Sequence, residues 1–142
     1  MPDPGERAIF LAGGLMDVPD WQSGAAARLE AECDLTPIHP RRPSFTEADH
    51  IPQIEWEFRH LMAADVLLFY FTKETLCPIT LFEYGKWLSR GKRLFVAIED
   101  GYRRSTDVVV QTRLERPSQR IWGDLDGAID EAVTWSRTRL FG

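Results

Sequence analysis

The run VLLFYF at residues 66–71 is a continuous apolar and aromatic stretch, and it decides the fold. Asp65 opens this run and a polar loop at 72–78 closes it, which predicts a short strand buried on both faces of a sheet. The runs AIFLA at 8–12 and RLFVAI at 93–98 have the same character. Strands buried on both faces occur in parallel sheets that are covered by helices, so the chain is predicted to be an α/β protein.

Helical patterns occupy the stretches between these strands. Asp20 is expected to cap a helix that ends near Glu32, and Gly91 stands at the end of a helix predicted over residues 78–90. Further helices are predicted at 51–64, at about 105–114 and after Asp124, and weaker strands at 35–38 and 119–122. The alternation predicts a doubly wound parallel sheet of about five strands in a single domain.

Two of these helical predictions depend on side-chain pattern. The helix at 51–64 has an apolar stripe, which consists of Ile54, Phe58, Leu61 and Met62. The stretch at 105–114 contains three adjacent valines, which also permit a strand because β-branched side chains favour extended backbone.

Length, charge and cysteine content limit the class of protein. The 142 residues suit one domain, expected over residues 8–142, with a loose polar tail at 1–7. The net charge of −5 argues against a nucleic-acid partner, which needs a broad basic face. No segment approaches the ~20 apolar residues of a membrane span, so no membrane partner is expected. Cys33 and Cys77 lie far apart and form no disulfide framework, which favours a cytoplasmic location.

Ligands of doubly wound sheets bind beyond the carboxyl ends of the strands. This rule selects four loops, at residues 13–21, 39–45, 71–78 and 99–106. The first of them begins with Gly13 and Gly14, which suit either close backbone approach to a ligand or a tight turn. The second contains Arg41 and Arg42, whose guanidinium groups suit a phosphate or carboxylate, although a solvated loop fits equally well.

Neither a cofactor nor a metal is expected from the motifs. The sequence has no G-x-G-x-x-G fingerprint, so a nicotinamide dinucleotide is not supported. His39, His50 and His60 do not have the spacing of metal ligands.

Glu83 is the strongest candidate for chemistry. It stands in LFEYGKW at residues 81–87, among apolar and aromatic neighbours, where an unpaired buried charge is costly. A solvent-facing position would make it ordinary. Glu55 and Glu57 flank Trp56 on the preceding helix, and at most one of these two acids can share a site with Glu83 because neighbouring residues point to different faces. We expect Glu55 to be solvated.

Three segments together resemble the nucleoside 2-deoxyribosyltransferase superfamily, and most closely its bacterial branch of nucleoside 2-deoxyribosyltransferase-like domains. They are IFLAGG at 9–14, QIEWEFRHLMAADVLLFYF at 53–71 and LFEYGKWLSRGKRLFVAI at 81–98. The likeness covers most of residues 8–114. It implies a flavodoxin-like parallel sheet, a small-molecule nucleoside or nucleotide substrate, and a homodimer or larger homo-oligomer.

The resemblance also implies roles for particular residues. Glu83 matches the family's nucleophile, which would attack C1′ of the sugar and form a glycosyl-enzyme ester in a retaining double displacement. Glu57 stands where the family places an aspartate that helps to hold the substrate and shuttle its proton. Glu74 is the acid nearest to a further acidic position of the family. Trp21 and Trp56 offer stacking surface for a base, and the segment 102–107 is the candidate for a loop that completes a neighbour's site.

The chain departs from the family pattern in two places. Relatives that hydrolyse deoxynucleoside monophosphates bind the phosphate through a first loop that contains serine and arginine, but residues 13–22 contain no arginine. Arg41 and Arg42 are possible substitutes, or the substrate is a free nucleoside. The C-terminal residues 140–142 also have no match to the tail that completes the transferase site.

The sequence therefore predicts an enzyme that cleaves the N-glycosidic bond of a nucleoside or nucleotide, by transfer to another base or to water. Two alternatives stay open at this point. One is a nucleotide-binding sensor on the same fold, without turnover. The other is a flavin-binding flavodoxin-like domain, which the lack of a Ser/Thr-rich phosphate cradle disfavours.

Overall fold

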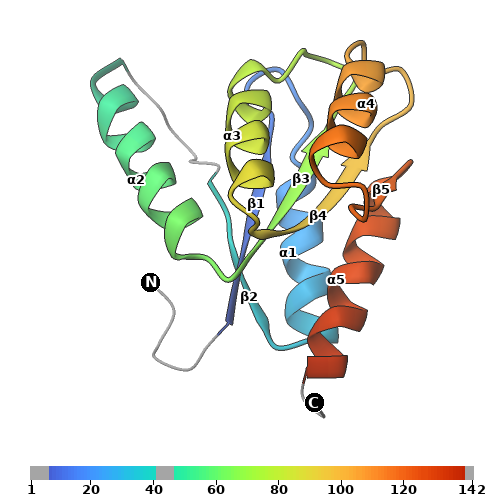
Figure 1. Cartoon of the computed structure of the whole chain (residues 1–142). Coiled ribbons are helices and arrows are strands. Elements are labelled where there is room, and N and C mark those ends of the chain that lie inside the picture. Colours follow the sequence, from blue (N-terminus) through green and yellow to red (C-terminus); the bar gives the residue numbers. More distant parts are fainter. Residues whose placement is uncertain (1–6, 41–46, 140–142) are drawn as a thin grey trace.

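The strand predicted from VLLFYF, β3 (Val66–Phe71), lies at the centre of a parallel sheet. The computed structural model describes residues 7–40 and 47–139 of the chain (Figure 1). The remaining strands are β1 (Arg7–Gly13), β2 (Leu35–Ile38), β4 (Arg93–Ile98) and β5 (Ile121–Trp122). The helices are α1 (Trp21–Glu32), α2 (His50–Ala63), α3 (Pro78–Ser89), α4 (Ser105–Glu115) and α5 (Leu125–Arg139), and a short 3₁₀ helix covers Glu47–Asp49.

The sheet has the strand order β2-β1-β3-β4-β5, and every pair of neighbours is parallel. This is the order of flavodoxin-like sheets, in which the switch point lies between β1 and β3. The predictions of an α/β class and of a flavodoxin-like sheet of about five strands are therefore confirmed.

Alternating side chains of the strands form two separate layers of core. Ile9 and Leu11 of β1 pack with α1 and α5 on one face of the sheet. Phe10 of β1 packs on the other face with Leu61 of α2, Tyr84 of α3 and residues of α4. Figure 1 shows α3 between α2 and α4 in this second layer, with α2 at the outer side. Because α2, α3 and α4 share a face, side chains of α2 and α3 can meet next to the sheet.

Local signals in the sequence explain most of the element boundaries. The Asp20 carboxylate accepts a hydrogen bond from the backbone N–H of Ser23 at 3.1 Å, which caps α1. The Asp124 carboxylate caps α5 by accepting from the N–H of Gly127 at 2.8 Å. Gly91 follows α3 with φ of +79°, a conformation that costs other residues more. The valine-rich stretch forms the helix α4 and not a strand.

The apolar stripe of α2 differs from the expectation for a helix that packs on a sheet. Ile54, Phe58 and Met62 are 52%, 46% and 50% exposed, and only Leu61 of the four stripe residues is buried. The flank of α2 that faces the protein instead presents Gln53, Trp56 and Leu61. The periodicity identified an apolar face correctly, but this face points away from the core.

Polar contacts fasten α2 at both of its ends. Near the start, Gln53 Nε2 donates to the Pro40 carbonyl oxygen at 3.2 Å. At the other end, Lys92 Nζ donates to the carbonyl oxygens of Leu61 and Met62 at 2.7 and 2.8 Å. A cation at this end also interacts favourably with the helix dipole. None of the helices within residues 7–40 and 47–139 combines the length and apolar character needed to cross a bilayer.

Candidate active site

Glu83 lies in the second turn of α3, which begins just beyond the carboxyl end of β3. Its side chain is partly buried on the flank of α3 that faces α2. The pKa of this carboxyl is raised to about 7, chiefly by burial and also by the nearby Glu57 carboxylate, while Lys86 opposes both effects. A carboxyl with a pKa near 7 is half-ionised at neutral pH, so it can act either as a nucleophile or in proton transfer.

Glu57 of α2 is the second carboxylate of this site. Its charge acts on Glu83 across the space between the two helices. The structure therefore brings together the two acids that the sequence analysis assigned to catalysis. Glu55, two residues earlier, points to solvent and forms an exposed ion pair with Arg59 at 3.8 Å, as expected for a solvated acid.

Two further residues belong to this neighbourhood and were not identified from the sequence. Gln53 Nε2 donates to Glu57 Oε1 at 3.3 Å, and Lys86 is the nearest cation acting on Glu83. Lys86 Nζ also lies 4.3 Å from the centre of the Phe58 ring, which connects α3 with α2. The spacing of Gln53 and Glu57, four residues apart on one helix, was the available signal for the first contact.

Trp56 packs between α2 and the sheet and is only partly exposed. Its ring lies 6.2 Å from that of Phe10 on β1, and it stacks on His60 with ring centres 4.1 Å apart. The proposed stacking role for a base would use the part of the ring that remains accessible.

Gly13, Trp21 and Tyr70 form a different group, on the α1 side of the sheet. A side-chain carbon at Gly13 would lie 2.6 Å from Trp21 Cζ2 and 2.9 Å from the Tyr70 carbonyl oxygen. Glycine is therefore required here because the Trp21 ring and the β3 backbone already fill the space. The Trp21 and Tyr70 rings meet edge to face with their centres 5.3 Å apart.

Acidic side chains surround the hydroxyl of Tyr70 in this group. The pKa of Tyr70 is raised to about 12, chiefly by burial and also by the Glu99 and Glu74 carboxylates. Glu74, the acid that the family likeness relates to a further acidic position, therefore lies near Tyr70. Its side chain is exposed in the loop after β3.

Gly14 marks the point where the loops after β1 and β3 meet. A side-chain carbon there would lie 3.3 Å from Thr75 Cγ2 and 3.6 Å from Cys77 Sγ. These two loops flank the switch point of the sheet, where ligands of this fold bind. Arg41 and Arg42, predicted to bind a phosphate or carboxylate, lie outside the described residues.

The segment 102–107, expected to reach a neighbour's site, is anchored by one buried residue and otherwise lies at the surface. Tyr102 is buried, and its hydroxyl donates to the Leu76 carbonyl oxygen at 2.7 Å. Ser105 already begins α4. Arg103, Arg104 and Asp107 remain exposed.

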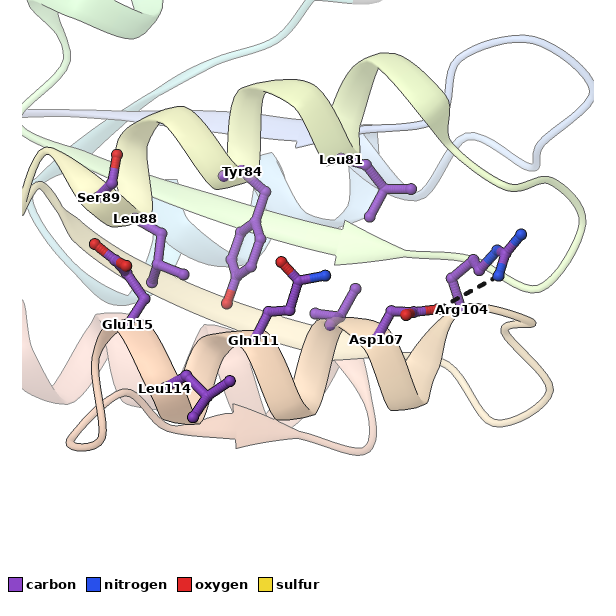
Figure 2. A pocket seen from close by; sticks show the side chains of 11 residues that line it. Leu81, Tyr84, Leu88, Ser89, Arg104, Asp107, Gln111, Leu114 and Glu115 are labelled. Carbon is purple, nitrogen blue, oxygen red and sulfur yellow. Dashed lines mark hydrogen bonds and ion pairs between the residues drawn. The ribbon is translucent and has the colours of Figure 1, made fainter.

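An open groove of about 600 Å³ lies on the opposite flank of α3 from Glu83. Figure 2 shows Leu81, Tyr84 and Leu88 of α3 facing Gln111 of α4 across it, with the Arg104–Asp107 ion pair at one end. Neither Glu57 nor Glu83 lines this groove, so its size is no argument about the carboxylate pair. Among the described residues no cluster of three or more His, Cys, Asp or Glu side chains could hold a metal ion.

The strand order and the acidic pair define the class of protein. It is a flavodoxin-like α/β domain in which two carboxylates are brought together, one from the helix before β3 and one from the helix after it. A profile of the nucleoside 2-deoxyribosyltransferase-like family matches residues 6–102, which is more than half of the chain. The chain therefore belongs to this family, and membership points to nucleoside glycosyl transfer as the class of reaction. A comparison with curated protein sequences found no match.

Proposed function

We propose that the chain cleaves the N-glycosidic bond of a nucleoside or nucleotide by a retaining double displacement. Glu83 attacks C1′ of the sugar as the bond to the base breaks, and the bond electrons leave with the base, which takes up a proton. The product of this step is a sugar ester of Glu83. A second base or a water molecule then attacks C1′, releases the sugar and regenerates the Glu83 carboxylate.

The pairing of Glu83 with Glu57 is the observation that carries this proposal. The transition state resembles an oxocarbenium ion, so a carboxylate held in partly buried surroundings stabilises the positive charge that develops on the sugar. The base that departs gathers negative charge and needs a proton. The raised pKa of Glu83 shows that the Glu57 carboxylate lies close enough to act on it, so we propose that Glu57 carries the proton to the base.

The remaining parts of the site are proposed from their positions. Gly13, Gly14, Trp21 and Glu74 lie around the loops after β1 and β3, and Trp56 lies beside Glu57 on α2. With Arg41 and Arg42 of the loop after β2, they are proposed to bind the sugar, the base and any phosphate. No cofactor or metal is proposed, because the displacement needs only carboxylates and a proton source.

A chromatographic screen for released base tests the proposed reaction directly. Purified protein is incubated with a panel of ribo- and deoxyribonucleosides and their monophosphates, with and without an acceptor base. We expect release of free base from at least one substrate and, with transferase activity, a new nucleoside when the acceptor is present. Saturable nucleotide binding without release over hours would instead favour the sensor alternative.

We propose that the partner of this chain is a second copy, which docks on the exposed apolar side chains of α2 and α3. Ile51, Ile54, Phe58 and Met62 are spaced by three or four residues and form one stripe along α2. Ile79 and Phe82 of α3, which are 65% and 73% exposed, share a face with Lys86, and Lys86 contacts Phe58. We call these six apolar residues the α2–α3 face.

The charges that border the α2–α3 face favour self-association over a foreign partner. Glu55 and Arg59 lie one helical turn apart beside the stripe, and both side chains are 62% exposed. A two-fold axis that pairs two α2 helices antiparallel would place the acid of each copy beside the base of the other. A contiguous apolar surface of this kind marks an interaction site on a water-exposed protein.

Sedimentation of the full chain is expected to give twice the monomer mass of 16.3 kDa. Ile54→Arg combined with Met62→Arg should raise the dimer dissociation constant about thirtyfold or more, because it buries two charges in an apolar interface. Leu114→Arg is the matched control, since Leu114 is 78% exposed on α4, away from this face. A monomeric wild-type protein would contradict the proposed assembly.

Both cysteines are free, which suits the cytoplasmic location that we also propose.

A further inference from the structure

Gln53 is a buried polar residue whose side chain joins two separate parts of the candidate site. It lies in the first turn of α2 and is 7% exposed. Its Nε2 atom donates to the Pro40 carbonyl oxygen at 3.2 Å and to Glu57 Oε1 at 3.3 Å. Pro40 lies two residues after the end of β2, so one amide group connects the backbone beyond β2 to the carboxylate of Glu57.

The orientation of the Gln53 amide follows from the chemistry of its neighbours. A backbone carbonyl and an ionised carboxylate can only accept hydrogen bonds. Rotating the amide by half a turn would place its own carbonyl oxygen against two acceptors, which is repulsive. The NH₂ group therefore faces Pro40 and Glu57, and its two hydrogens match the two acceptors.

This arrangement has a cost that stability alone does not explain. The Oε1 atom of Gln53 is buried, and no hydrogen-bond donor reaches it within the described parts of the chain, 7–40 and 47–139. Leaving a buried acceptor without a partner destabilises the fold. A methionine would fill a similar volume at this position without that cost. The retained amide therefore indicates a role for its donor side, which faces Glu57.

The position of Glu57 matters because its charge acts on Glu83. Among the described residues, the charged groups that shift the pKa of Glu83 are Glu57, which raises it, and Lys86, which lowers it. The strength of such an interaction falls with the distance between the charges. A side chain that holds the Glu57 carboxylate in place therefore sets the electrostatic environment of Glu83, although it does not contact Glu83 itself.

We propose that Gln53 is a positioning residue, whose amide fixes the Glu57 carboxylate relative to Glu83 and fastens it to the end of β2 at Pro40. This assignment rests on the proposed pairing of the two acids. Gln53 acts through Glu57 and takes no part in bond making. Without this donor, Glu57 loses a contact that holds its carboxylate beside Glu83.

The test measures the titration of Glu83 in the unliganded protein, by carbon NMR of its side-chain carboxyl. Gln53→Met removes the donor and preserves most of the volume. We expect the titration midpoint of Glu83 to fall by roughly half a unit or more, because the like charge of Glu57 moves away. Gln53→Asn keeps an amide but is one methylene too short to reach both acceptors, so it should shift the midpoint in the same direction.

A second background separates positioning from a purely structural role. In Glu57→Gln the like charge is already absent, so adding Gln53→Met should leave the Glu83 midpoint where Glu57→Gln alone puts it. Gln22→Met, at a fully buried glutamine on the other side of the sheet, is the matched control. It is expected to lower thermal stability without moving the Glu83 midpoint.

Two results would overturn the positioning role. One is an unchanged Glu83 midpoint in folded Gln53→Met and Gln53→Asn proteins. The other is a shift of equal size that persists in the Glu57→Gln background. Because the titration uses no substrate, it tests the positioning role independently of base release. A protein that releases no base can still show a Glu83 midpoint that depends on Gln53 through Glu57.

Discussion

Replacing Glu83 by glutamine is expected to lower the rate of base release by about 10⁴-fold or more, because the reaction then has no carboxylate to form the ester. Glutamine has nearly the same shape as glutamate, so the packing between α2 and α3 should persist. The rate is measured by chromatography of the freed base, with the best substrate of the nucleoside panel.

Glu55→Gln is the matched control for this substitution. Glu55 lies on α2 close to the site in sequence, but its side chain is 62% exposed and paired with Arg59. Its removal should change the rate by less than about twofold, as expected of an exposed ion pair. A Glu83→Gln protein that stays folded and releases base at the wild-type rate would exclude Glu83 as the nucleophile.

The same substitution is expected to stabilise the folded protein above pH 7. Because the pKa of Glu83 is raised from 4.5 to about 7, the folded chain binds more protons than the unfolded chain between these pH values. The contribution of Glu83 to the free energy of unfolding is therefore most favourable at low pH and decreases as pH rises through this window. Above pH 7 the ionised carboxylate lowers the free energy of unfolding by an amount that no longer changes with pH.

Glutamine cannot ionise, so Glu83→Gln should avoid this cost. We expect the difference in unfolding free energy between variant and wild type to grow from about zero near pH 4 to about 2 kcal/mol at pH 8, allowing for the partial exposure of the side chain. Urea denaturation at several pH values measures it, with Glu55→Gln as reference. A difference that does not change with pH would show that Glu83 has an ordinary pKa. Together with the loss of activity, a gain in stability would identify a residue kept for function at the expense of the fold.

The sequence predicted the sheet well because its strands carry unambiguous local signals. The runs at 66–71 and 93–98 are short, apolar and bounded by polar residues, and β3 and β4 have these bounds. Asp20 and Asp124 identified the starts of two helices because side-chain capping is a local interaction. The pairing of Glu57 with Glu83 could be anticipated only through the family likeness, since no local rule relates two residues on different helices.

Other features depended on contacts that no local pattern specifies. The periodicity of Ile54, Phe58 and Met62 reveals an apolar face but not what covers it. In the structure the sheet does not cover these side chains, which are about half exposed. Gly13 suited either close approach of a ligand or a tight turn, and no local pattern could show that the Trp21 ring packs against it. A single glutamine in a helix carries no distinctive signal, so Gln53 emerged only from its hydrogen bonds.

The attachment of α2 has a consequence for how the site is maintained. This helix contributes Glu57, and it is held by Gln53 at one end, by Lys92 at the other and by Leu61 against the sheet. Strand pairing in the sheet involves no residue of α2, so we expect this helix to open locally at a lower free-energy cost than unfolding of the whole domain. The fraction of molecules that have both acids in place is therefore governed by the opening equilibrium of one helix, and any molecule that bridges α2 and α3 shifts that equilibrium toward closure.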